Sequence, residues 1–265
     1  MAESSYTAII QEVFTSRFET GMDAVDFERS DLTAAADRLG VQRPKNIGDI
    51  VYSSRYRSKL PDSIQATAPE GYEWIIRGRG QSRYRFVLVR AIPLAPNEQI
   101  GATKVPDATP GVVAMYAFGD EQALLARVRY NRLVDIFTGI TCYSLQNHLR
   151  TAVPGIGQVE TDELYVGVDR RGRQYVLPVQ AKGGRDALSI VQIEQDTALC
   201  ESRFPDLICL PVAAQFMRDK LIALFSFERI DGEVKVLSER HYKLVEPKEL
   251  TAEDLAAYRR RTDPD

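Results

Sequence analysis

The spacing of apolar residues predicts helices in the first part of the chain. Residues 1–40 read as mostly helical, with apolar side chains recurring every three or four positions towards their end. Asp31 is a plausible N-cap of that last helix, and Gly40 is a plausible stop. Residues 43–57 then predict a further helix, with Pro44 near its first turn.

A strand pattern replaces the helical one after these helices. Two β-rich runs, 74–76 and 84–89, flank a flexible basic tip at residues 78–82 and predict a hairpin. A short helix, a Gly-containing turn and a second helix carrying Arg and Tyr resemble a helix-turn-helix, and the hairpin would be the wing of a winged helix. Residues 91–111 hold four prolines and predict a linker. We therefore expect two domains, residues 1–115 and 116–265.

The second domain mixes helical and strand patterns, which is typical of an α/β fold. Residues 121–150 read as helical with a break near Gly139, and two β-rich runs, 163–169 and 174–182, follow as a hairpin with its turn at 170–173. The other expected elements are a helix at 186–201, strands at 207–216, 220–230 and 233–245, an Asp231-Gly232 turn before the last strand, and a helix at 252–261.

The candidate chemistry lies on the hairpin that ends at residue 182. In its second strand one face carries Val176, Pro178, Gln180 and Lys182, and the other, expected to be buried, carries Tyr175, Leu177, Val179 and Ala181. Glu160 and Asp162 share a face of the first strand. Pairing through the turn places Asp162 opposite the neighbourhood of Gln180 and Lys182. One end of the hairpin thus gathers two carboxylates, an amide and an ammonium group.

This set of side chains suits a hard divalent cation. Magnesium takes oxygen ligands, usually includes one or two carboxylates, and keeps waters and a substrate phosphate oxygen. Asp162 is the expected main ligand, and the Gln180 side-chain oxygen and the Ala181 carbonyl complete the protein share. Lys182 would orient or help deprotonate the attacking water, or stabilise charge on the phosphate. The expected chemistry is in-line hydrolysis of a phosphodiester.

The pattern D-x17-Q-A-K, from Asp162 to Lys182 at the end of two paired strands, resembles the PD-(D/E)xK nuclease superfamily. The glutamine at 180 is similar to that of the Mrr-like branch of restriction endonucleases. The resemblance covers residues 125–215 and implies a mixed sheet flanked by helices, in the core order α–β–β–β–α–β. It implies that Asp162 binds the metal, that Gln180 takes the second motif position and that Lys182 is catalytic. It further implies support from Glu160 or Glu163, from Gln192 and Gln195, and from Gln146 on an expected helix 140–150, where the family often supplies a glutamate.

Charge is distributed unevenly along the chain. Residues 43–90 hold ten Lys or Arg and four Asp or Glu, which is a net charge of +6. The whole chain has a net charge of −3, so the other residues together carry −9. A basic module beside an acidic remainder suits a polyanion on one face. We expect DNA contacts from the second helix, the hairpin and the surroundings of the site, namely from Arg55, Arg57, Arg77, Arg79, Arg83, Arg85, Arg171 and Arg185.

Several classes of protein are excluded by what the chain lacks. No stretch approaches the ~18 apolar residues of a membrane span, and the start has no secretory pattern. Three scattered cysteines make neither a disulfide framework nor a zinc knuckle, so the cytoplasm is the expected compartment. Only two histidines are present, and His148 is expected to be a cap or surface residue rather than a catalytic base. No Walker-type loop or Rossmann fingerprint occurs.

We therefore expect a magnesium-dependent endonuclease that hydrolyses double-stranded DNA, of the sequence-specific type II-like restriction kind. A homodimer is expected because two symmetric sites cut both strands of a near-palindrome most simply. One alternative is a repair or defence nuclease directed at DNA structure or at modified bases. Another is a catalytically silent DNA-binding protein with a nuclease-like core. A weaker one is an enzyme for a small phosphorylated substrate.

Overall fold

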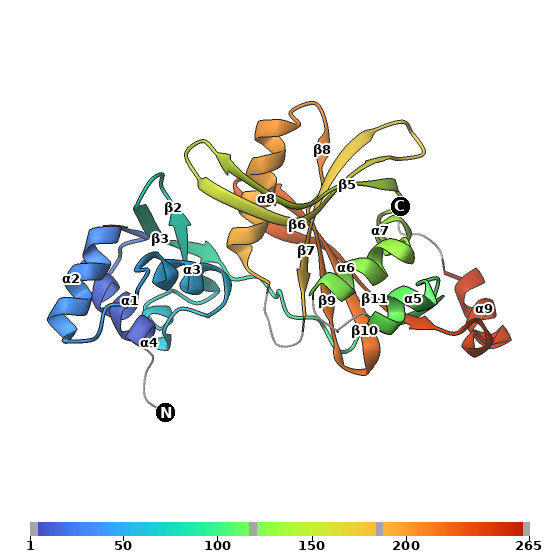
Figure 1. Ribbon diagram of the computed structural model, residues 1–265, viewed down its shortest axis with the longest axis horizontal. Coiled ribbons are helices and arrows are strands. Elements are labelled where there is room, and N and C mark those ends of the chain that lie inside the picture. Colours follow the sequence, from blue (N-terminus) through green and yellow to red (C-terminus); the bar gives the residue numbers. More distant parts are fainter. Residues whose placement is uncertain (1–4, 117–120, 184–187, 262–265) are drawn as a thin grey trace.

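The computed structural model describes residues 5–116, 121–183 and 188–261 and shows an α/β protein with two lobes, each built on its own sheet (Figure 1). The smaller lobe has a three-stranded antiparallel sheet in the order β1-β3-β2. Its elements are α1 (Ser5–Thr15), β1 (Ala24–Glu28), α2 (Arg29–Leu39), α3 (Gly48–Tyr56), α4 (Asp62–Gln65), β2 (Tyr72–Gly78) and β3 (Arg83–Arg90).

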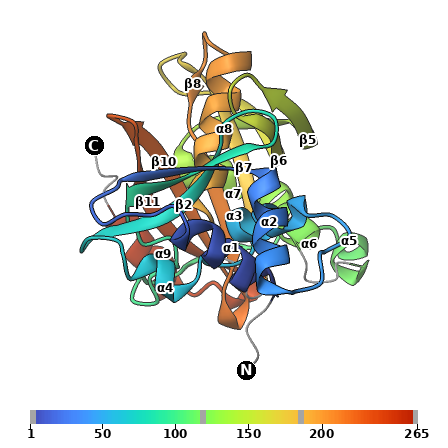
Figure 2. The same ribbon diagram turned by 90° about the vertical axis from the view of Figure 1, so that its left-hand side faces the viewer.

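An aromatic cluster joins the helices and the sheet of the smaller lobe. Phe14 on α1 meets Trp74 and Phe86 edge-to-face, with ring centroids 5.1 Å apart in both pairs. All three side chains are buried, so they supply much of the apolar area that holds this lobe together. Figure 2, which views this lobe from its outer side, shows the helices lying over the sheet.

The predicted hairpin of this lobe and the helix that ends before Gly40 are confirmed, but the N-cap of that helix is Glu28 rather than Asp31. Residues 1–40 are not helical throughout. β1 interrupts them and pairs with β3, so the hairpin is part of a three-stranded sheet. Its five residues alternate between exposed and buried, a signal too short to stand out between two helices. α3 begins at Gly48, beyond Pro44. β4 (Thr103–Pro106) is another strand that was not expected, and it lies in the expected linker. It pairs with β11 of the larger sheet, although it precedes the domain boundary expected at residue 115.

The larger lobe has a curled mixed sheet whose main path is β4-β11-β10-β9-β7-β6-β5, with β8 beside β7. Its helices before the sheet are α5 (Gly111–Tyr116), α6 (Glu121–Tyr130) and α7 (Leu133–Thr138). Its other elements are β5 (Thr141–Val153), β6 (Gly157–Val168), β7 (Gln174–Lys182), α8 (Ile190–Arg203), β8 (Ile208–Cys209), β9 (Val212–Phe216), β10 (Leu221–Ile230), β11 (Glu233–Val245), α9 (Ala252–Arg259) and two short 3-10 turns at Arg218–Lys220 and Pro247–Glu249.

Helices cover both faces of the central strand β7. Leu177, Val179 and Ala181 pack under α6 and α7, as the predicted buried face requires. The opposite face is buried as well, because Val176 packs under α8. Pro178 lies where the partner of β7 changes from β8 to β9, so its missing N–H falls at a break in that ladder.

The helix predicted over residues 140–150 is wrong, because this segment is strand β5. β5 lies at the edge of the sheet and pairs with β6. A register shift between Ser144 and Gln146 interrupts the alternation of side chains that is typical of a strand. Leu145 and Leu149 are four residues apart, which is the spacing of apolar residues in a helix. The strand expected over residues 207–216 is divided into β8 and β9. The other predicted strands, the Asp231-Gly232 turn and the C-terminal helix are confirmed, with bounds that differ by a few residues. No helix in the described parts of the chain is long and apolar enough to cross a membrane.

Candidate active site

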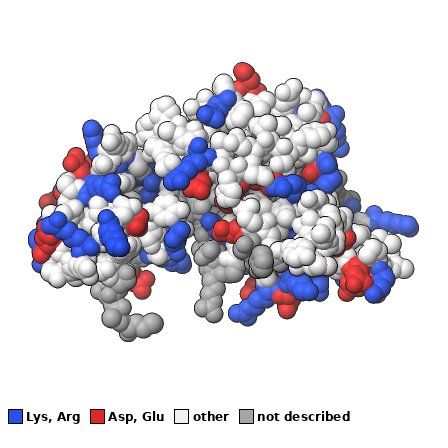
Figure 3. Space-filling model, viewed as in Figure 1, with Lys and Arg blue, Asp and Glu red and all other residues white. Residues whose placement is uncertain are grey.

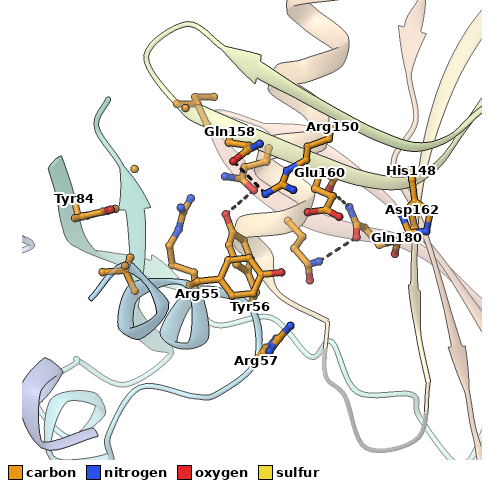
Figure 4. Close-up of a pocket in the computed structure, with 18 of the residues that line it drawn as sticks. Arg55, Tyr56, Arg57, Tyr84, His148, Arg150, Gln158, Glu160, Asp162 and Gln180 are labelled. Carbon is orange, nitrogen blue, oxygen red and sulfur yellow. Dashed lines mark hydrogen bonds between the residues drawn. The ribbon is translucent and has the colours of Figure 1, made fainter. Parts of the chain in front are cut away.

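A cavity of about 830 Å³ lies between the two lobes. α3 and the turn after β2 form the wall on the side of the smaller lobe, while β5, β6, the end of β7 and α8 form the other wall. Figure 4 shows Arg55, Tyr56 and Arg57 of α3 and its C-cap on one side, facing Glu160, Gln180 and Asp162 on the other.

Polar contacts to α8 fix the lobes on either side of this cavity. The Tyr56 hydroxyl donates to Gln195 Oε1 at 3.0 Å, and the Ser189 hydroxyl donates to the Arg55 carbonyl at 2.8 Å. Arg77 forms a two-pronged ion pair with Glu194, in which Nε lies 2.8 Å from Oε2. The β5–β6 turn also approaches β2 so closely that a Cβ on Gly78 would lie 2.6 Å from the Ile156 carbonyl oxygen.

The pairing of β6 with β7 brings the predicted catalytic residues together. The antiparallel register pairs Glu163 with Val179. The next positions along the two strands, Asp162 and Gln180, are therefore neighbours as well. The Ala181 backbone N–H donates to Asp162 Oδ2 at 2.8 Å. Asp162, Gln180 and Lys182 all line the cavity, as does Glu160. This juxtaposition is the one that the sequence pattern predicts.

Asp162 is a partly desolvated carboxyl. Burial raises its pKa above the ordinary value, and this effect exceeds the opposing effects of the Ala181 hydrogen bond and the Lys182 charge. His148 lies between neighbours on β5 that pair with Glu163 and Thr161, and it has a φ of 48°. This left-handed backbone is uncommon for a residue other than glycine and marks a locally strained position beside the carboxyl.

The Gln180 side chain is held on both sides by protein groups. Its Nε2 donates to Asp196 Oδ2 at 2.9 Å and to the Glu160 carbonyl at 3.2 Å. Its Oε1 accepts from Gln192 Nε2 at 3.1 Å, which leaves one acceptor position on that oxygen. Gln180 is therefore fixed in one orientation, with a single lone pair left for any ligand.

Asp196 is a completely buried carboxyl on α8 beside this network. It accepts hydrogen bonds from the Thr161 hydroxyl and from Gln180. Burial raises its pKa to about 7 in spite of these bonds, and the Asp162 charge raises it further. No local pattern singles out this residue, because an aspartate inside an amphipathic helix usually faces solvent.

Lys182 lies at the end of β7 with 8% of its surface exposed. Within the described chain its ammonium group makes neither a hydrogen bond nor an ion pair of its own. Its charge nevertheless acts on the Asp162 and Asp196 carboxyls and lowers the pKa of both. The ammonium group is thus available to a ligand in the cavity.

The cavity offers oxygen donors of the kind that a divalent cation takes. No group of three or more His, Cys, Asp or Glu side chains that could hold a metal occurs among residues 5–116, 121–183 and 188–261. Magnesium requires only one or two carboxylates. Asp162 and Glu160 stand two positions apart on β6 and both line the cavity.

Other predicted site residues lie elsewhere. Glu163 is buried on the opposite face of β6, where Arg129 Nε at 2.8 Å and the Ser144 hydroxyl at 2.7 Å donate to it. Gln146 is exposed on β5 and does not line the cavity. Arg171 lies in the β6–β7 turn, at the end of the hairpin remote from Asp162.

Gln192 and Gln195 line the cavity from α8, as predicted. Arg185 lies outside the described residues.

The predicted DNA-contacting arginines fall into two groups. Arg77 and Arg85 are paired with carboxylates, Arg77 with Glu194 and Arg85 with Asp26. Figure 3 shows the same interleaving, with Lys and Arg scattered among Asp and Glu over the smaller lobe on this face. Arg55 and Arg57 line the cavity, and Arg79 and Arg83 line a separate hollow beside the hairpin tip; these four have no ion pair within the described residues.

Sequence reasoning missed several residues that line the cavity, namely Glu121, His148, Arg150, Gln158 and Tyr84. Glu121 begins α6, which is separated from β5 by α7. The helical pattern beginning at residue 121 was the available signal.

Comparisons of the chain with family models, with curated proteins and with solved structures find no match.

Proposed function

We propose that this protein is a magnesium-dependent nuclease that hydrolyses phosphodiester bonds of DNA, with its centre at Asp162, Gln180 and Lys182. The observation that carries the proposal is the convergence of these three residues and Glu160 on one wall of a cavity whose other wall bears arginines. The order of elements from α6 to β9 supports the proposal, because it contains the order that the family resemblance implies, with α7 and β8 as additional elements.

Asp162 and Glu160 would hold the cation, with the remaining lone pair of Gln180 and the Ala181 carbonyl as further candidates. The bound cation would supply Lewis-acid polarisation of the phosphate and a more acidic water. The Lys182 ammonium would orient the attacking water or stabilise negative charge that develops on the phosphate. Gln180, fixed by Asp196 and Gln192, would keep the strand end in register with Asp162.

The finer proposal is a type II-like restriction enzyme that cuts double-stranded DNA as a homodimer, in which the smaller lobe reads DNA in the manner of a winged helix. The basic excess of residues 43–90 and the arginines of α3 support a role of this lobe in binding. Light scattering with and without DNA tests the dimer, and a monomer under both conditions would remove it.

A catalytically silent DNA-binding protein is the second candidate. One observation favours it: Gln180 stands where an acidic ligand is more usual, and its amide is engaged by two neighbouring side chains. In that case DNA binds with unchanged affinity in magnesium and in EDTA, and no substrate is cut.

The test is incubation of purified protein with unmethylated and methylated plasmid DNA, in magnesium and in EDTA. Discrete fragments that require magnesium are expected and would support both the nuclease and its sequence specificity. Nicking or smearing would support the nuclease and overturn the restriction proposal. Bound but uncut DNA under every condition would overturn the nuclease and favour the silent binding protein.

A further inference from the structure

The wall of the cavity on the smaller lobe alternates aromatic rings with guanidinium groups. The rings of Tyr52 and Tyr56 meet edge-to-face at 5.0 Å. The Arg57 guanidinium lies 5.1 Å from the centre of the Tyr52 ring, and that of Arg55 lies 4.8 Å from the centre of the Tyr56 ring. Tyr52 remains 44% exposed. Aromatic faces and arginine planes in this arrangement are platforms on which unpaired nucleobases stack.

The α8 side of the cavity carries two unused hydrogen-bonding atoms. Gln192 and Gln195 lie three residues apart on one face of α8 and both line the cavity. Gln195, 5% exposed, has a buried Nε2 without a partner, and Gln192 has a buried Oε1 without a partner, among the described residues. The site thus holds one donor and one acceptor that no protein group uses, and the edge of a nucleobase presents groups complementary to such a pair.

The size of the cavity limits what can enter. Its volume of about 830 Å³ lies within the range of about 300–1,000 Å³ for small-ligand sites. The Tyr56–Gln195 hydrogen bond and the approach of Ile156 to Gly78 bridge the two lobes at residues that line the cavity. A stacked base pair brings both strands and its neighbours with it, whereas one nucleotide removed from its stack fits a cavity of this size.

We propose that the cavity receives a single unpaired nucleotide of the strand to be cut, stacked against Tyr52 and Arg57 with its base edge towards Gln192 and Gln195. This inference rests on the proposed nuclease function of the same cavity and names its substrate class. The unpaired nucleotide comes either from single-stranded DNA or by extrusion from a duplex, and the chemistry of the pocket is the same for both.

The test is DNA binding in EDTA, followed by fluorescence anisotropy of labelled oligonucleotides of equal length. A single strand, a fully paired duplex and a duplex with one mismatched pair are compared. Unpaired DNA is expected to bind about tenfold more tightly than the paired duplex, and Tyr52→Ala is expected to remove this preference, because base stacking on an aromatic side chain is of that order. Tyr130→Ala is the matched control, since Tyr130 is also 44% exposed but does not line the cavity.

Tight binding of the single strand alone would support the inference with single-stranded DNA as the source. Tight binding of the mismatched duplex as well would support extrusion, which costs least at a mismatch. Equal affinity for all three DNAs, or the same effect of Tyr52→Ala and Tyr130→Ala, would overturn the inference. Because binding is measured without metal, failure of this inference is distinguishable from failure to cleave, which bears on the proposed function.

Discussion

The side-chain amide of Gln180 donates a 2.9 Å hydrogen bond to Asp196, a carboxyl with no exposed surface. The bond joins the end of the central strand β7 to helix α8, which covers that strand beside the cavity. A buried carboxyl in such a place is costly when ionised, and its hydrogen bond holds the Gln180 side chain in one orientation at the cavity.

Asp196 makes the stability of the protein depend on pH. Its pKa is about 7 in the folded protein against an ordinary 3.8, so between these values the folded state binds the additional proton. The contribution of this group to the free energy of unfolding is then fully present below about pH 4 and is lost as the pH rises to about 7, by at most about 4 kcal/mol.

Asp196→Asn should remove this dependence, because asparagine can still accept from Gln180 and donate to the Thr161 hydroxyl. The measurement is urea denaturation of the wild type and the variant between pH 4.5 and 8. The variant should gain stability relative to the wild type as the pH rises. A constant difference across that range would show that Asp196 is not protonated in the folded protein.

Asp162 should set the acid limb of the pH–rate profile of cleavage. Only the deprotonated carboxyl binds a cation, and burial raises the pKa of Asp162 above its ordinary value. We expect the rate to rise with pH through a midpoint above the usual aspartate range, and the midpoint to move to lower pH as magnesium is increased. Single-turnover rates at two magnesium concentrations measure this, and a midpoint independent of magnesium would speak against Asp162 as the ligand.

Gly78 is a point of close approach between the lobes. A Cβ there would lie 2.6 Å from the Ile156 carbonyl oxygen, a backbone atom that cannot move without displacing the β5–β6 turn. Gly78→Ala should lower the free energy of unfolding by about 1–3 kcal/mol. Gly101→Ala is the control, since a Cβ at Gly101 meets nothing within 4 Å. Equal urea midpoints for the two variants would contradict the packing described between the lobes.

The arginines should differ in their effect on DNA affinity. Arg57 is exposed at the cavity and has no carboxylate partner in the described chain, whereas Arg85 is paired with Asp26. Arg57→Ala should weaken DNA binding and reduce the slope of log affinity against log salt by roughly 0.7–0.9, the value of one lost phosphate contact. Arg85→Ala should change the slope less. Titrations at several salt concentrations decide this, and identical slopes for both variants would remove the distinction.

The β6–β7 hairpin and the meeting of Asp162 with Gln180 were predictable, because two β-rich runs flank a short turn that contains Gly172 at a φ of 79°. β5 was not predictable, since its bulge after Ser144 disturbs the alternation. The contact between Tyr56 and Gln195 joins residues 139 positions apart, and no local pattern records such a pair. Asp196 was missed for the same reason, because its burial depends on the packing of α8 against β6 and β7.

The most direct test of the account compares single-turnover DNA cleavage by the wild type, Asp162→Asn, Lys182→Ala and Lys235→Ala. Lys235 is exposed on β11, outside the cavity, and serves as the control for loss of a lysine. The account predicts that Asp162→Asn and Lys182→Ala each lose at least about 100-fold in rate, as expected for removal of a group that stabilises the transition state, while Lys235→Ala cleaves like the wild type. Cleavage at the wild-type rate by Lys182→Ala and Asp162→Asn would contradict the assignment of this cavity as the active site.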